Sequence, residues 1–213
     1  MKNPIPPLAA SLFLAGCSFG LVYHVDQPAE RLVFAPGRAT ARVLGVDATA
    51  SYLGPGERIA TSRTLLGNIT REVDPYGEDQ IVFAVTVRNS SDSVAVVEPA
   101  AARLVAPHQV EAARTLADYK KAWPTYPIDS ENMAADQAEA FAYVLRTLLL
   151  EQQIVQGDSA AGRLAFPAPG GAEGTASIEL PVAVGQASGT LRFAFSVEPP
   201  PETSARASAG RAS

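Results

Sequence analysis

The stretch Ile81-Val82-Phe83-Ala84-Val85-Thr86-Val87-Arg88 decides the fold of this chain. Large apolar side chains recur at every second position, beginning with Ile81. Side chains of a β-strand alternate between the two faces of a sheet, so this pattern predicts a central strand with one face in a core. The next residues, Asn89-Ser90-Ser91-Asp92, are of types that favour a turn and would end the strand there.

The same alternation returns near the C-terminal end of the chain. There Leu191, Phe193, Phe195 and Val197 share one side, with Arg192 and Ser196 on the other. Weaker strand patterns occur at 31–35, 41–53, 58–66, 94–98, 103–106, 162–166 and 175–184. Many short strands separated by Gly, Pro, Asn and Asp predict a mainly β chain that folds as an antiparallel β-sandwich.

One stretch, 110–153, departs from this pattern because Ala, Glu, Leu and Gln dominate it. We expect a helical insertion here, with a short helix over about 110–121 and a long one over about 131–153. Asp129 or Ser130 would cap the start of the long helix, and Gly157 would follow its end. Its apolar face should pack on the sandwich itself. That face comprises Phe141, Val144, Leu145 and Leu148.

The N-terminal end carries the motif Leu14-Ala15-Gly16-Cys17, which contains the only cysteine of the chain. A short apolar run precedes it, and Lys2 supplies a positive charge before that run, as in a secretory signal peptide. The run is shorter than the roughly 20 apolar residues needed to span a bilayer. The motif resembles the lipobox of bacterial lipoproteins. This resemblance implies cleavage before Cys17, diacylglycerol on its thiol and acylation of the new amino group.

The residue that follows the cysteine bears on the destination of such a lipoprotein. In lipoproteins of enteric type, Ser18 in place of Asp favours the outer membrane, with the protein facing the periplasm. Two or three acyl chains anchor a protein stably, whereas one binds only marginally. We therefore expect residues 1–16 to be a signal peptide, 17–29 a tether, 30–198 the folded sandwich, and the proline-led segment 199–213 a disordered tail.

Composition restricts the partners of the folded part. Hydrophobic residues make up 47% and charged residues 18% of the 213 residues, as in globular proteins, and the formal net charge is −5. An acidic balance argues against nucleic acid and against anionic lipid headgroups as partners. We expect the lipid alone to hold the protein on the membrane.

The later strands also resemble those of uncharacterised immunoglobulin-like bacterial lipoproteins. Gly157-Asp158-Ser159, Gly162, Leu164 and Phe166 match a pattern that precedes a late strand there, and a final alternating pair follows at 178–184 and 191–197. The resemblance covers roughly 80–198, interrupted by the predicted helices. It implies an immunoglobulin-like sandwich and no particular activity.

Gly157-Asp158-Ser159 allows two interpretations. Short Gly-Asp-Ser motifs surround the nucleophile of some hydrolases, and a serine of this kind needs a base within hydrogen-bond reach. His108 is the only plausible base for Ser159, because no histidine follows it and His24 lies in the predicted tether. The alternative interpretation is a turn whose Asp158 and Ser159 side chains bond to nearby backbone, and we favour it.

Other candidate sites have structural explanations too. Asp74, Glu78 and Asp79 supply hard oxygens of the kind that bind calcium, but they lack the alternating spacing of an EF-hand and suit a solvated hairpin connection. No phosphate-binding glycine motif is present. We therefore expect no metal, no cofactor and no catalytic residue.

The segment between the two predicted helices, residues 119–127, carries Trp123 and Tyr126 among prolines and two lysines. Rigid aromatic side chains dominate interface hot spots, so these two would contact an envelope protein partner. The alternative, which we favour, is that they fold back and close one end of the core. The sequence thus predicts a lipid-anchored envelope protein that acts as a non-enzymatic binding, assembly or structural module. The alternatives are a hydrolase of envelope polymers that uses Ser159, and an accessory subunit of an envelope or secretion complex.

Overall fold

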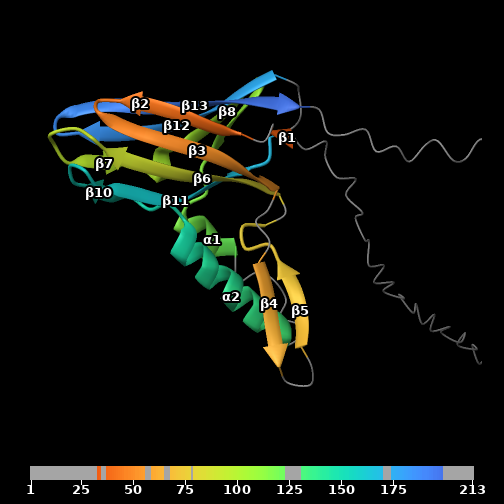
Figure 1. Ribbon diagram of the computed structural model, residues 1–213. Helices are drawn as coiled ribbons and strands as arrows, with labels where there is room; N and C mark the ends of the chain where they lie inside the picture. The colour runs from red at the N-terminus through yellow and green to blue at the C-terminus, as the bar shows by residue number, and fades with distance from the viewer. Residues whose placement is uncertain are drawn as a thin grey trace, which may run out of the picture.

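Two antiparallel sheets pack face to face in the computed structural model of the chain, which is mainly β (Figure 1). The predicted signal peptide, tether and tail, together with Cys17, Trp123 and Tyr126, lie outside the residues that the structure describes. Those residues are 33–34, 37–55, 59–64, 68–77, 79–122, 131–169 and 174–198.

The first sheet has four strands, in the order β11-β6-β3-β2. Their bounds are β2 (Arg38–Val43), β3 (Val46–Pro55), β6 (Gln80–Asn89) and β11 (Ser159–Pro167). The predicted single run 41–53 is therefore wrong, because Leu44 and Gly45 form a turn between β2 and β3. Both residues have positive φ, 51° and 77°, a conformation that glycine adopts readily and that a two-residue hairpin turn requires.

The second sheet has seven strands, with β1-β13-β12-β7-β10 in one path and β8 and β9 joined to it through β12. The short 3-10 helix η1 (Pro99–Ala101) links β7 to β8. The strand bounds are β1 (Val33–Phe34), β7 (Ala95–Val97), β8 (Arg103–Ala106), β9 (Gln109–Ala112), β10 (Gln152–Ile154), β12 (Gly174–Val184) and β13 (Ala187–Glu198).

The central strands of both sheets have the order of an immunoglobulin-like sandwich, and β2 adds a strand beside β3. In that fold strand B lies between A and E in one sheet, and strand F lies between C and G in the other. Here β6 lies between β3 and β11, and β12 lies between β13 and the β7 and β8 strands. Both helices fall between β9 and β10 in the chain, after the strand-C equivalents and before the strand-E equivalent β11. The predicted helical insertion is thus confirmed, although its bounds differ.

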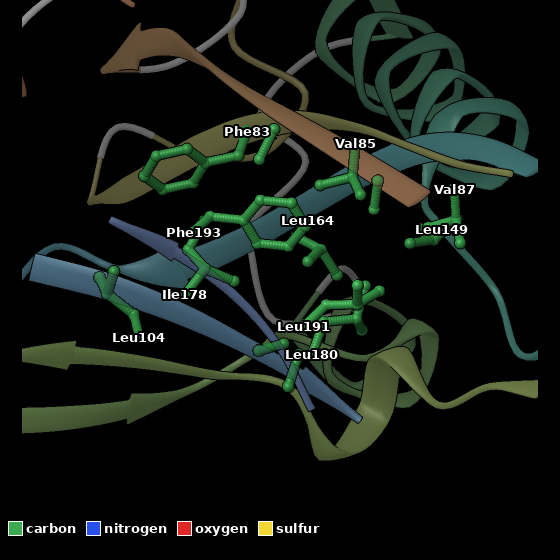
Figure 2. Packing of buried hydrophobic residues seen from close by; sticks show 14 of the residues in the cluster. Phe83, Val85, Val87, Leu104, Leu149, Leu164, Ile178, Leu180, Leu191 and Phe193 are labelled. Carbon is green, nitrogen blue, oxygen red and sulfur yellow. The ribbon is translucent and has the colours of Figure 1, made fainter. Parts of the chain in front are cut away.

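The core lies between the sheets, and alternating positions of facing strands fill it (Figure 2). Phe83, Val85 and Val87 of β6 point toward Ile178, Leu180 and Leu191 of the opposite sheet. All four apolar side chains predicted for each of β6 and β13 are buried. The aromatic rings of Phe34, Phe83 and Phe195 pack at tilted or edge-on angles at one end of this inter-sheet core.

Helix α1 (Leu116–Ala122) is shorter than predicted and begins later. Residues 110–112, which the sequence placed in this helix, belong to the edge strand β9 (Gln109–Ala112). The reason is a capping box at Thr115: its N–H and hydroxyl both donate to Asp118 Oδ2 at 2.7 Å, and the Asp118 N–H donates to Thr115 Oγ1 at 3.3 Å. These bonds satisfy backbone groups that the first helical turn leaves open, so the helix starts there.

Helix α2 (Glu131–Thr147) ends six residues before its predicted end at 153. The Leu149 N–H donates to the Arg163 carbonyl at 2.8 Å, so the chain leaves the helix to run beside β11. A Cβ on Gly162 would come 2.6 Å from Leu149 Cα, so glycine permits this approach. Gly157 does not follow the helix: with φ of 83° it turns the chain from β10 into β11.

The helices pack on the outer face of the first sheet, as expected for the predicted apolar face. Val144 of α2, Leu148 just after it and Tyr119 of α1 form a smaller cluster with Val82 and Ala165, which point away from the inter-sheet core. Leu145 was predicted in this face but is 42% exposed. We call this group the helix-side cluster; it comprises Tyr76, Val82, Tyr119, Val144, Leu148 and Ala165.

A two-stranded hairpin, β4 (Ile59–Thr64) with β5 (Asn68–Val73), extends beside α2 between β3 and β6 of the chain (Figure 1). The sequence did not predict β5. It was also wrong about the connection around Pro75, because β5 pairs with β4 whereas β6 pairs with β3 and β11. The connection therefore joins the hairpin to the sandwich and is not itself a hairpin turn.

Candidate functional site

Ser159 and His108 lie at opposite ends of the sandwich. Ser159 begins β11 beside Asn89, whose N–H donates to the Asp158 carbonyl, whereas His108 lies in the turn between β8 and β9. Strand β12 connects the two ends: a Cβ on Gly174, at its start, would come 3.1 Å from Pro107 Cγ, and the N–H of Gly185, just beyond its end, donates to the Val94 carbonyl. Its 11 residues span about 36 Å at 3.3 Å per residue. The structure does not bring this pair together.

The end that holds Ser159 is organised by the buried side chain of Asn89. Its Nδ2 donates to the carbonyls of Ser93 and Ile154 at 2.7 and 2.8 Å, and its Oδ1 accepts from the N–H and hydroxyl of Ser91. Asn89 is completely buried, and a buried amide needs such partners. The side chain thus ties together the turns that follow β6 and β10, which is a structural role.

The acidic residues weighed above as calcium ligands are Asp74, Glu78 and Asp79, and the structure describes two of them. Asp74 Oδ1 accepts from the N–H groups of Tyr76 and Gly77 at 3.0 and 3.1 Å, which forms a local turn. Asp79 is exposed, and Glu78 lies outside the described residues. Among the residues that the structure describes, no group of three or more His, Cys, Asp or Glu side chains is arranged to hold a metal ion.

Two ionisable groups near the helices have shifted pKa values. The backbone and side-chain hydrogen bonds from Thr115 lower the pKa of Asp118 below 3.8, because they favour the carboxylate. Burial raises the pKa of Tyr119 well above 10, and the neighbouring Tyr76 raises it further. Tyr76 and Tyr119 pack edge-on, with ring centroids 5.8 Å apart, and the Tyr76 hydroxyl lies 2.6 Å from Thr147 Oγ1. Tyr119 is therefore protonated at neutral pH and packs as part of the helix-side cluster.

The outer face of the first sheet carries a regular array of polar side chains that sequence reasoning missed. Antiparallel register aligns these residues into three rows that cross the strands from β2 to β11. The rows are Arg42, Asp47, Arg88 and Ser159; Thr40, Thr49, Thr86 and Ala161; and Arg38, Ser51, Ala84 and Arg163. We call this surface the arginine–threonine face.

The face carries exposed arginine side chains. Arg38, Arg42 and Arg88 are exposed, and Arg163 is half-buried. Arg42 Nε lies 3.2 Å from Asp47 Oδ1, and the Ser90 hydroxyl donates to Asp47 Oδ2 at 3.0 Å. The three rows contain four arginines and one aspartate, whereas the whole chain has a formal net charge of −5.

The helices bound this face at one end. The row beyond Arg38, Ser51, Ala84 and Arg163 contains Val82 and Ala165, which α1 and α2 cover. Helices α1 and α2 therefore cover the part of the outer sheet face that adjoins these rows.

One local sign of the face was present in the sequence. Arg38-Ala39-Thr40-Ala41-Arg42 places Arg, Thr and Arg on one side of a strand and small residues on the other. The other two strands with arginines contribute residues 88 and 163, and only the register of the folded sheet places these in line with β2.

Comparison of the chain with protein-family models, with curated proteins and with solved structures gave no match. Within the described part of the chain, neither helix has the length and apolar character needed to cross a bilayer.

Proposed function

We propose that the chain is a lipid-anchored protein of the bacterial cell envelope that acts without catalysis, as a binding module. The motif Leu14-Ala15-Gly16-Cys17 carries this proposal, because Cys17 is the only cysteine and follows an apolar run of signal-peptide length. Acyl chains on Cys17 would tie the sandwich to the outer membrane, facing the periplasm. The separation of Ser159 from His108 favours this role over the hydrolase alternative.

The position of the first strand supports an anchor at one end of the sandwich. β1 pairs with the last residues of β13, with Val33 opposite Glu198, at the end away from the Asn89 turns. The 16 residues from 17 to 32 would reach at most about 58 Å when fully extended. The anchor would therefore keep this end near the bilayer, and the outer sheet faces that the helices do not cover would be open to the periplasm.

The test is expression of the full chain, with its own signal, in a bacterium that sorts lipoproteins. We expect the mature protein in the membrane fraction, with an intact mass that shows cleavage before Cys17 and added acyl groups. Cys17→Ser should abolish both acylation and membrane retention, whereas Ser18→Ala should change neither. Recovery of the wild-type protein in the soluble fraction, with residue 17 unmodified, would contradict the proposal.

A second variant tests the destination. Ser18→Asp should move the acylated protein from the outer to the inner membrane fraction on a density gradient. Outer-membrane recovery of this variant, or inner-membrane recovery of the wild-type protein, would contradict the sorting part of the proposal and leave the lipid anchor standing.

A further inference from the structure

We infer that residues 19–25, which follow the proposed acylation site, contact the lipid bilayer beside the acyl chains and hold the sandwich close to the membrane. This inference deepens the proposed function and rests on it for the acyl chains of Cys17. The partner is a lipid surface, and the contact is made by apolar and aromatic side chains, not by charge.

The sequence directly after Cys17 is apolar. Ser18-Phe19-Gly20-Leu21-Val22-Tyr23-His24-Val25 contains five large aliphatic or aromatic side chains, and Asp26 is the first acidic or basic residue other than histidine. A segment that serves only as a solvated spacer is typically rich in Gly, Ser, Pro or charged residues. Tyrosine is enriched where a membrane meets water. Residues 19–25 therefore have the composition of a membrane-contacting segment.

The register of β1 offers this segment no place in the sheet. β1 begins with Val33 opposite Glu198, the last residue of β13, and runs antiparallel to it. Continued backward, this register would place residue 32 opposite Pro199, the first of three prolines. Proline has no N–H to donate to a neighbouring strand. Residues before Val33 therefore gain no ladder by prolonging β1 along β13.

The end of the core beside β1 is filled by residues of the sandwich itself. Phe34 is 1% exposed. Its ring centroid lies 5.1 Å from that of Tyr52, 5.3 Å from that of Phe83 and 6.1 Å from that of Phe195. The apolar side chains of 19–25 thus need burial elsewhere. A bilayer to which Cys17 is already tied supplies it, because tethering raises the effective concentration of the second contact.

The contact would shorten the connection between membrane and sandwich. Only the seven residues from 26 to 32 would then separate the bilayer from β1, and they reach at most about 25 Å when extended. This part contains Asp26, Pro28, Glu30 and Arg31, a composition that suits a solvated spacer. The β1 end of the sandwich would stay near the membrane surface.

The first experiment measures the contribution of the segment to membrane binding. The mature chain, residues 17–213, is alkylated at its only cysteine with one 14-carbon chain, because a single chain of this length binds membranes only marginally. Binding to phosphatidylcholine vesicles is measured by flotation. Phe19→Ser/Leu21→Ser/Tyr23→Ser should weaken it about tenfold or more, because three large apolar side chains no longer leave water. Equal binding of this variant and the wild-type sequence would overturn the inference.

A matched variant controls for general hydrophobicity. Leu44 and Val155 are 39% and 51% exposed and lie in turns at the end of the sandwich away from β1. Leu44→Ser/Val155→Ser removes exposed aliphatic side chains there and should leave vesicle binding unchanged. An equal loss in both variants would overturn the inference, because binding would then follow overall apolar surface. Thermal unfolding of each variant verifies that the sandwich is intact.

The second experiment locates the segment directly. The chain has one tryptophan, so Trp123→Phe/Tyr23→Trp places a single indole in the segment, and Trp123→Phe/Ala29→Trp places one in the spacer. In vesicles, we expect brominated lipids to quench the indole at position 23 strongly and the one at position 29 weakly. Blue-shifted but unquenched emission at position 23 would overturn the inference, because the segment would then be buried in the sandwich or in a second copy.

The inference and the proposed function fail separately. A protein that is acylated in the cell but whose indole at position 23 is not quenched would refute only the segment contact. A protein that is never acylated in the cell, but whose alkylated form shows both the quenching and the loss in the triple serine variant, would refute the anchor and leave the segment contact standing.

Discussion

The inter-sheet core and the helix-side cluster differ in how the chain builds them. The inter-sheet core draws alternate side chains from strands of both sheets, nearly all aliphatic or phenylalanine. The helix-side cluster is smaller, includes the tyrosines at 76 and 119, and uses only Val82 and Ala165 from the sheet beneath it. The comparison indicates that the sandwich is the cooperative unit and that the helices attach to one of its outer faces.

The largest expected effect is in the inter-sheet core. Phe83 is fully buried and packs against the rings of Phe34, Phe166 and Phe195. Phe83→Ala should lower the free energy of unfolding by about 3–5 kcal/mol, through lost apolar burial and the cavity that remains. Urea unfolding followed by near-UV and far-UV circular dichroism should show one shifted transition. A decrease in the free energy of unfolding below about 1 kcal/mol would show that Phe83 is not packed in the core.

A matched pair of valines sharpens the comparison. Val85 in the inter-sheet core and Val144 in the helix-side cluster are 1% and 0% exposed. Each change to alanine should cost about 1.5–3 kcal/mol locally. We expect Val85→Ala to shift unfolding of the whole sandwich, and Val144→Ala to increase amide hydrogen exchange mainly in α1 and α2. Identical exchange patterns in the two variants would show one cooperative unit and contradict the comparison.

The smallest effect concerns the start of α1. Thr115→Ala removes the hydroxyl of the capping box and should cost about 1 kcal/mol of helix stability. Hydrogen exchange of the first amides of α1 would report this loss. Unchanged exchange there would mean that packing of Tyr119 alone holds the helix.

The same capping box has a defined pH dependence. Since folding lowers the pKa of Asp118 below 3.8, its carboxylate contributes stability above that value, and the contribution is lost as pH falls through the lowered pKa. The difference in stability between wild type and Asp118→Asn should therefore be present at pH 7 and shrink below pH 3.8. A difference that is constant from pH 7 to pH 2 would contradict this assignment.

Sequence periodicity predicted the inter-sheet core well because the core depends on alternation within single strands. The positions of Phe83 and Phe193 follow from their neighbours two residues away. Burial of Val82 cannot be predicted from its neighbours in the strand, because the helices that cover it come from residues 116–147. The end of α2 was missed for a similar reason: the Arg163 carbonyl that draws Leu149 away is a tertiary partner.

The candidate site was also hard to predict, because it depends on contacts between residues that are far apart in the sequence. Ser159 and His108 are chemically suitable types, but pairing them needs a distance that the strand topology does not allow. The arginine–threonine face was missed because its members come from positions 38 to 163 and become neighbours only through register. The predictions for Cys17, Trp123 and Tyr126 stay predictions, since these residues lie outside the described part of the chain.

The tight hairpin between β2 and β3 also restricts how this protein can change over evolutionary time. Because alternate residues of a strand face opposite ways, losing one residue within β2 would turn Arg38 toward the hydrophobic interior and bring alanines to the surface. Gain or loss of two residues would preserve that orientation. Homologues that retain the surface should therefore vary in β2 length by even numbers.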